Sequence, residues 1–221
     1  MAERRYVIDG SWEEHAELRD GTQVRLRLIR PDDKQLLADG LARMSPESRY
    51  YRFFSAKDHL TSAELRYLTE LDGENHVAIG AARTGPSGED VGMGVARFIR
   101  FRDRPEVAEA AVTVIDEAQG LGLGKILLSR LLVAASERGV KRFQCDFLAH
   151  NKGMRALVEA LADQARYGHE SGVIQAEFSL EGPSGLFGAL AGVARREGQL
   201  TPGAGFPPLA TVKQTRRSDK K

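Results

Sequence analysis

"DEAQGLGLGKILL" (Asp116–Leu128) is the stretch of sequence that decides the fold. In it Gly120, Gly122 and Gly124 alternate just ahead of an apolar helical run. A glycine inside an ordered element costs about 0.5–1 kcal/mol relative to alanine, so the bend needs an unusual backbone shape or a close approach to another group. We therefore expect a strand, a short glycine loop and an amphipathic helix, in that order.

Two known phosphate-binding loops are excluded by the spacing of these glycines. A Walker A loop needs a glycine separated by four residues from the Gly-Lys pair and a Ser or Thr after the pair, but Gln119 and Ile126 stand at these positions. The pattern G-x-G-x-x-G fails because its sixth residue is Lys125 or Leu127. A glycine loop before a helix still aims free N–H groups and a helix dipole at one point, which suits a pyrophosphate. A tight turn without a ligand is the alternative that the glycines alone leave open.

The elements around the loop predict one α/β domain. Three short runs rich in small and β-branched residues, separated by Gly, Pro and Asp, predict an antiparallel meander before the loop. Periodicity and capping signals predict the other elements. The predicted strands are 22–29, 76–82, 91–101, 106–115, 142–149 and 172–180, and the predicted helices are 30–44, 45–54, 61–71, 125–139 and 151–165.

Composition limits the class of protein. The chain has 221 residues, 42% of them hydrophobic, and a net charge of +1, so no global field would recruit nucleic acid or an anionic membrane. The single cysteine, Cys145, excludes an internal disulfide framework and suits a reducing compartment. No signal peptide, membrane-spanning run or metal-ligand spacing is evident, so we expect a cytoplasmic protein without a metal. We expect an extension over 1–21 with one short strand at most, a domain over 22–180 and a Gly/Pro-rich, basic tail over 181–221.

The loop and its surroundings resemble a known family. Gln119-x-x-Gly122-x-Gly124, after "AVTVIDEA" and before a leucine-rich helix, resembles the acetyl-CoA signature Q/R-x-x-G-x-G/A of the GNAT N-acetyltransferase superfamily. The order of elements over 22–180 is also similar. The resemblance implies an α/β fold with a mixed, twisted, mostly antiparallel sheet and helices on both faces. "SPESRYYRFF", "AEAAVTV" and "NKGMRALVEAL" further resemble the bacterial protein-lysine acetyltransferases of this superfamily.

The resemblance also implies a binding site for acetyl-CoA as cosubstrate. It would lie in the opening where strands 106–115 and 142–149 splay. The backbone of Val112 and Val114 would pair with the pantetheine arm, and Asn151 would lie near the thiol end. The amides that would hold the pyrophosphate belong to Gln119, Gly120, Leu121, Gly122, Leu123, Gly124 and Lys125.

Transfer to an amine requires a group that accepts a proton, because a lysine side chain has a pKa of about 10.4. Glu109 is the only charged residue in "VAEAAVTVI", and its apolar neighbours would desolvate it and raise its pKa. The resemblance implies that this glutamate is the general base; a solvent-exposed glutamate at a strand edge is the alternative. Many family members carry a tyrosine seven residues after the asparagine to protonate the leaving thiolate, but Val158 stands there. Cys145 is expected to be a structural thiol.

The predicted function is therefore transfer of an acetyl group from acetyl-CoA to a primary amine, with a protein lysine as the acceptor. A small-molecule amine as acceptor, or a non-catalytic acyl-CoA-binding regulator, are the alternatives. We expect no specific nucleic-acid partner and no membrane partner, and the Gly-rich tail leaves a homodimer open.

Overall fold

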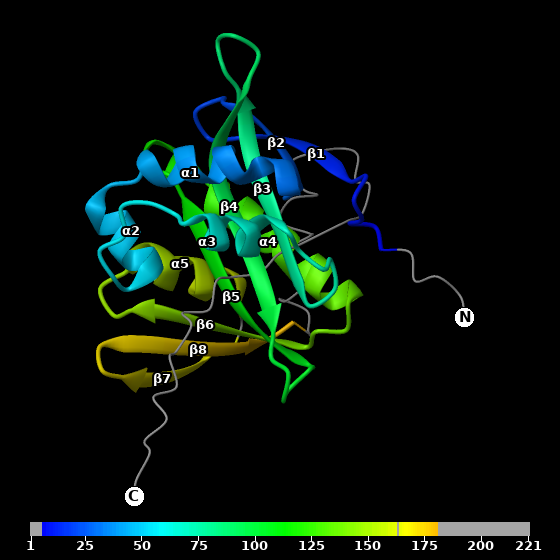
Figure 1. Cartoon of the computed structure of the whole chain (residues 1–221). Coiled ribbons are helices and arrows are strands. Elements are labelled where there is room, and N and C mark those ends of the chain that lie inside the picture. The colour runs from blue at the N-terminus through cyan, green and yellow to red at the C-terminus, as the bar shows by residue number, and fades with distance from the viewer. Residues whose placement is uncertain (1–5, 163, 181–221) are drawn as a thin grey trace, which may run out of the picture.

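The computed structural model describes residues 6–162 and 164–180, which contain one eight-stranded sheet (Figure 1). Neighbouring strands lie in the order β1-β2-β3-β4-β5-β6-β8-β7. Every pair is antiparallel except β5 and β6, which are parallel. The strands are β1 (Glu13–Glu17), β2 (Gln23–Leu28), β3 (His76–Thr84), β4 (Asp90–Arg100), β5 (Val107–Val114), β6 (Arg142–Leu148), β7 (Arg166–Glu170) and β8 (Val173–Ser179).

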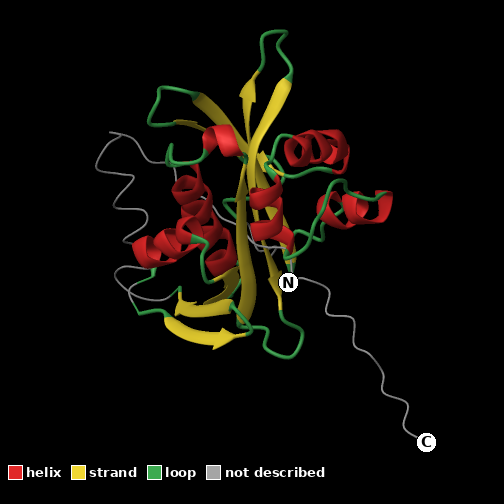
Figure 2. Cartoon of the chain, turned by 90° about the vertical axis from the view of Figure 1, so that its left-hand side faces the viewer, coloured by secondary structure: helices red, strands yellow, loops and turns green. Residues whose placement is uncertain are grey.

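Helices cover both faces of this sheet (Figure 2). Helix α1 crosses β4 on one face, and α4 packs against β4 and β5 on the other with α5 beside it. The helices are η1 (Pro31–Asp33), α1 (Lys34–Ala42), α2 (Pro46–Phe53), α3 (Ser62–Thr69), η2 (Asp116–Ala118), α4 (Leu123–Glu137) and α5 (Lys152–Leu161). The predicted fold class, a mixed and mostly antiparallel sheet between helices, is confirmed.

The capping signals of the sequence form as expected. The Ser45 side chain accepts a hydrogen bond from the amide of Ser48, 3.1 Å away, at the start of α2, where Pro46 is the first helical residue. Thr61 and Glu64 form a reciprocal capping box at the start of α3. Ser48, Tyr51 and Arg52 of α2 line a cleft beside the glycine loop.

The core lies mainly between α4 and the centre of the sheet. The inner face of α4 is a stripe of leucines with no exposed surface, which pack over the aromatic side chains of β4 and β6. Burial of one such leucine contributes about 1.5–3 kcal/mol, so this contact fixes the helix, and with it the loop before it. The side chains concerned are Leu127, Leu128, Leu131, Leu132, Phe98, Phe143 and Phe147.

The sheet opens between β5 and β6. The two strands pair only along Val107–Glu109 and Arg142–Gln144. Beyond Glu109, β5 continues to Val114 on β4, while β6 continues to Leu148 on β8. The edge of β5 from 110 to 114 therefore has no neighbouring strand among the described residues, and the expected splay of these two strands is confirmed.

Two elements differ from the sequence analysis or add to it. Strand β7 was not predicted, because all of its side chains are exposed and no alternation marks it; its pairing with β8 defines it. Strand β1 is the one short strand that the sequence allowed in 1–21. It pairs with β2, and Ile8 and Leu18 of that segment are buried in the core, which the sequence did not predict. The predicted tail, 181–221, lies outside the described residues.

Candidate active site

The glycine loop runs from the end of β5, through η2, to the start of α4. Gly120 has φ +74° and Gly122, the N-cap of α4, has φ +94°. Residues with a Cβ rarely adopt such values, so the sequence places glycine where the chain turns from strand to helix. At Gly124 the constraint is close packing against α5, because a Cβ there would lie 3.1 Å from Leu157 Cδ1.

The turn leaves a run of backbone amides without acceptors. Among the described residues, the N–H groups of 120–124 donate to no protein acceptor, whereas the amide of Gln119 donates to Asp116 O (3.2 Å) and that of Lys125 to Gly122 O (3.0 Å). Five of the seven predicted amides are therefore available, and they lie at the positive end of the α4 dipole. This arrangement is suited to an anion such as a diphosphate.

Polar side chains hold the loop against α2. The Nε2 atom of Gln119 donates to Ser48 Oγ (3.1 Å) and to Val114 O (3.2 Å). The Asp116 carboxylate accepts from the Ser45 amide and hydroxyl and from Ser48 Oγ, each at 2.8 Å. Burial disfavours the charged carboxylate, but these hydrogen bonds outweigh it and hold the pKa of Asp116 below its ordinary value. Asp116 thus fixes the entry to the loop as an anion.

A cleft of about 730 Å³ opens beside the loop, between β5, α2 and the start of α5. It brings together most of the predicted cofactor residues; Leu121, Leu123 and Glu109 do not line it. The Leu123 side chain has no exposed surface and belongs to the core. Predicted residues that line the cleft are Val112, Val114, Gln119, Gly120, Gly122, Gly124, Lys125 and Asn151, and additional ones include Arg19, Ser48, Tyr51, Arg52 and His150.

The backbone of β5 faces this cleft at two predicted positions. The Ile115 amide donates to Met93 O in β4 (3.1 Å), so odd-numbered positions of β5 point their backbone groups at β4. The N–H and C=O groups of Val112 and Val114 therefore point to the other edge, where β6 has diverged. A pantetheine amide could pair with them as a strand would.

Asn151, which lines the cleft, is the N-cap residue of α5. Its Oδ1 atom accepts from the Met154 amide (3.0 Å) and caps α5. The ring centroids of Tyr51 and of His150, the residue before Asn151, lie 5.2 Å apart. The Tyr51 hydroxyl donates a hydrogen bond to Glu47 Oε1 (2.6 Å). This hydrogen bond raises the pKa of Tyr51, so the phenol stays protonated at neutral pH.

Glu109 lies at the point where β5 and β6 part. It is the last β5 residue paired with β6, opposite Gln144, and it is half-buried. The Cγ2 atom of Val114 faces Gly124, so the Val114 side chain lies on the α4 side of the sheet. Glu109 and Val114 are separated by an odd number of positions along β5, so their side chains lie on opposite faces. Glu109 therefore faces the side of α1, α2 and α3.

The negative charge of Glu109 affects the pKa values of groups on α2, α3 and β6. Burial lowers the pKa of Arg52 in α2 to about 10, and the negative charge of Glu109 opposes that shift. Burial raises the pKa of Tyr67 in α3, and Glu109 adds to it. Burial likewise raises the pKa of Cys145 in β6, as do Asp146 and Glu109, so this thiol is an unreactive core group. Arg52 remains a cation at neutral pH and provides a positive charge between the cleft and Glu109.

Arg19 is one of the cleft residues that the sequence analysis did not assign to the site. Its amide donates to Leu121 O (3.1 Å) and its Nη1 atom to Gly120 O (3.2 Å), so the turn between β1 and β2 holds the glycine loop from outside. Nothing in the sequence of 1–21 marks this residue, because the contact spans about a hundred positions. Arg52 lies in "SPESRYYRFF", whose resemblance to the family assigned no role to this residue.

Two general features concern other ligands and membranes. The described residues hold no group of three or more His, Cys, Asp or Glu side chains placed to bind a metal ion. None of the helices in the described part of the chain combines the length and the apolar character needed to cross a membrane.

Comparison with known proteins identifies the family. Residues 37–162 match the model of the acetyltransferase (GNAT) family. The chain is 35% identical over 147 residues to acetyltransferase Pat of Mycolicibacterium smegmatis, covering 66% of this chain and 42% of that protein. It is 31% identical over 144 residues to acetyltransferase PA5475 of Pseudomonas aeruginosa, covering 65% of this chain and 76% of that protein.

A solved structure agrees with these matches. The GNAT domain of S. lividans PAT superposes with a TM-score of 0.70 at 30% identity, covering 78% of this chain and 99% of that one. The chain spans less than half the length of the Mycolicibacterium relative. Family and relatives together show an acyltransferase enzyme of a family that uses acetyl-CoA. The chain therefore belongs to the acetyltransferase (GNAT) family, and its similarity to the two Pat proteins supports the protein-lysine acetyltransferase branch.

Proposed function

We propose that the chain transfers an acetyl group from acetyl-CoA to a protein lysine, by direct attack of the amine and with Glu109 as general base. The observation that carries this proposal is the position of Glu109 at the opening between β5 and β6, next to the cleft that holds the free loop amides. We keep 22–180 as the proposed catalytic domain, against which the described part of 6–21 packs.

The residues present fit the donor. Free amides at 120–124 would hold the diphosphate, and Arg19 and Lys125 line the cleft beside them with positive charge. The outward backbone groups of Val112 and Val114 would hold the pantetheine arm in the splay. Asn151 would contribute by fixing the start of α5, since its side chain is already engaged with its own helix.

Glu109 would take the proton from the acceptor ammonium, directly or through a water. The Arg52 guanidinium of α2 interacts electrostatically with the Glu109 carboxylate. The neutral amine then attacks the thioester carbon; the new C–N bond forms and the C–S bond breaks. A backbone N–H near Val114 would stabilise the negative charge that develops on the acyl oxygen.

The leaving thiolate would take its proton from solvent. Val158, at the position where many family members carry a tyrosine, has no exposed surface. A thiol has a pKa of about 8.5, so its thiolate is a tolerable leaving group without a dedicated acid.

The test compares two glutamate variants of the whole chain. Acetyl-CoA is supplied with a panel of lysine peptides and small amines, and release of free thiol is measured. Glu109→Gln should lower kcat by about 10²- to 10⁴-fold while acetyl-CoA affinity changes less than about two-fold. Glu106→Gln is the matched control, because Glu106 is a half-exposed carboxylate paired with Arg142 (2.8 Å) just before β5, and it should retain activity.

The outcomes separate the alternatives. Full activity of Glu109→Gln would contradict its role as the base. Turnover with small amines but with none of the peptides would contradict the protein-lysine acceptor. Acetyl-CoA binding without turnover on any amine would contradict transfer and favour a regulator that binds acyl-CoA.

A further inference from the structure

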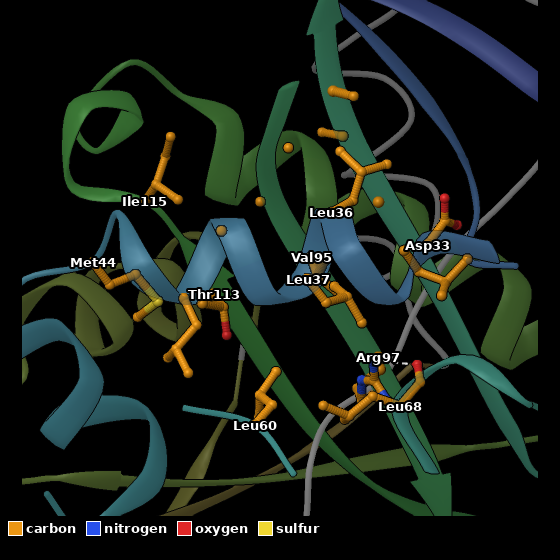
Figure 3. A pocket seen from close by; sticks show the side chains of 18 of the residues that line it. Asp33, Leu36, Leu37, Met44, Leu60, Leu68, Val95, Arg97, Thr113 and Ile115 are labelled. Atoms are coloured by element: carbon orange, nitrogen blue, oxygen red, sulfur yellow. Dashed lines mark hydrogen bonds between the residues drawn. The ribbon is translucent and has the colours of Figure 1, made fainter. Parts of the chain in front are cut away.

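A second hollow lies under α1, separate from the loop amides (Figure 3). It has a volume of about 100 Å³ and is a half-open pocket between α1, Leu60 just before α3 and Leu68 near its end, and the face of β2, β3, β4 and β5. Its walls are mainly apolar, with Leu36, Leu37, Leu60, Leu68 and Val95 among the side chains that Figure 3 shows converging on it.

This hollow adjoins the proposed cofactor cleft. Met44 and Thr113 line both of them, and Figure 3 shows these two side chains together at one end of the hollow, with Asp33 at the other. Thr113 and Glu109 lie on the same face of β5, four positions and therefore about 13 Å apart. The proposed transfer site lies along this stretch of β5, with the base toward one end and the hollow at the other.

The polar groups in the walls of the hollow are already engaged. Arg27 forms two hydrogen bonds of 2.7 Å with the Asp33 carboxylate, and Arg25 binds the Asp90 carboxylate. Arg97 Nη2 donates to Leu68 O (2.8 Å), and its Nη1 atom lies 3.1 Å from His76 Nε2. Arg25 and Arg27 are each paired with a carboxylate, so Arg97 adds the net positive charge of the wall, which disfavours an ammonium group such as that of lysine.

We infer that the hollow receives the hydrocarbon tail of the donor's acyl group, and that the enzyme uses acyl-CoA thioesters longer than acetyl-CoA. This inference rests on the proposed function, and the bonds formed and broken are the same. An apolar cavity of about 150 Å³ binds benzene, so about 100 Å³ accommodates about four carbon atoms. The preferred donor is therefore a straight acyl group of about four to six carbons.

The size of the preference follows from apolar burial. Each methylene that leaves water for a protein interior increases affinity about four-fold. Affinity should therefore rise through acetyl-, butyryl- and hexanoyl-CoA, and then fall for decanoyl-CoA, whose tail exceeds the hollow.

Gly40 allows the hollow to be filled without a clash. It lines the hollow from within α1, and a Cβ placed on it meets no atom within 4 Å. Gly40→Leu should remove the preference for hexanoyl-CoA and leave acetyl-CoA affinity within about two-fold. Gly40→Ala is the matched control, because it makes the same change in helix propensity with one methyl group and should keep most of the preference. Leu37→Ala should move the optimum to longer chains.

The experiment measures affinity for each acyl-CoA by calorimetry and initial rates with the same donors. Thermal unfolding confirms that each variant folds. A flat or falling affinity from acetyl- to hexanoyl-CoA in the wild type, or an unchanged preference in Gly40→Leu, overturns the inference. Acetyl transfer without a chain-length preference defeats this inference alone, whereas chain-length-dependent binding without transfer to any amine defeats the proposed function and leaves the assignment of the hollow intact.

Discussion

Replacing Gly122 by alanine tests the link between the shape of the loop and its ligand. Gly122 has φ +94°, and a Cβ there would meet only Arg19, at 3.7 Å from Nε and 3.9 Å from Cγ. These are ordinary contacts, so the substitution introduces backbone strain and no clash. The strain of an L-residue in this region is about 1–2 kcal/mol.

The chain relieves this strain when the peptide before residue 122 rotates. Rotation moves the amide N–H of residue 122 off the point on which the loop amides converge. A hydrogen bond to a charged group contributes about 1.5–3 kcal/mol, so loss of this one bond weakens binding of acetyl-CoA by about 10- to 100-fold. Gly122→Ala should therefore lose both stability and affinity.

Gly139→Ala is the control at the other end of the same helix. Gly139 follows α4 with φ +79°, and no atom lies within 4 Å of a Cβ placed on it. Urea unfolding should show a loss of about 1–2 kcal/mol in both variants. Calorimetry should show weaker acetyl-CoA binding in Gly122→Ala alone. Wild-type affinity in Gly122→Ala, or an equal loss in the two variants, would refute the reasoning.

Three further predictions concern other parts of the molecule. Burial and the charge of Arg97 lower the pKa of His76 to about 4, so only the unfolded state gains a proton between pH 6.5 and 4. The contribution of His76 to the free energy of unfolding is therefore full above pH 6.5 and falls by at most about 3 kcal/mol toward pH 4. Urea unfolding followed against pH should show this loss of stability, with a smaller slope in His76→Gln. Arg19→Met removes the hydrogen bond to Gly120 O and a cation beside the loop, and should weaken acetyl-CoA several-fold in calorimetry, whereas an unchanged Kd would assign Arg19 no part in the site. Cys145, fully buried and with a raised pKa, should react with a thiol reagent only in denaturant, and rapid labelling of the native chain would contradict its place in the core.

The sequence predicted what local chemistry determines. Alternating glycines, the cap at Ser45 and the capping box of Thr61 and Glu64 specify their own backbone shapes, so the loop and the helices around it were found. The opening between β5 and β6 followed from the resemblance to the family. Strand β7 was missed because an exposed edge strand is defined by its partner and carries no pattern of its own.

The remaining features depend on contacts between distant segments. Arg19 reaches the loop across the fold, and Arg52 interacts with Glu109 because α2, far away in the sequence, packs near β6 where it pairs with β5. The apolar hollow under α1 arises from three segments that meet only in the folded chain. The spacing of residues within one segment does not predict contacts with distant segments, so the roles of Arg19 and Arg52 and the hollow under α1 could be found only from the structure.

The central claim is that the free amides of 120–124 bind the diphosphate of the donor. The most direct measurement is a titration of the ¹⁵N-labelled chain with CoA and with pantetheine, which lacks the diphosphate, followed by amide chemical shifts. CoA should shift the resonances of 120–124 more than those of Gly85 and Gly88 in the distant β3–β4 turn, and pantetheine should leave 120–124 in place. Unshifted amides at 120–124 with saturating CoA would contradict the account.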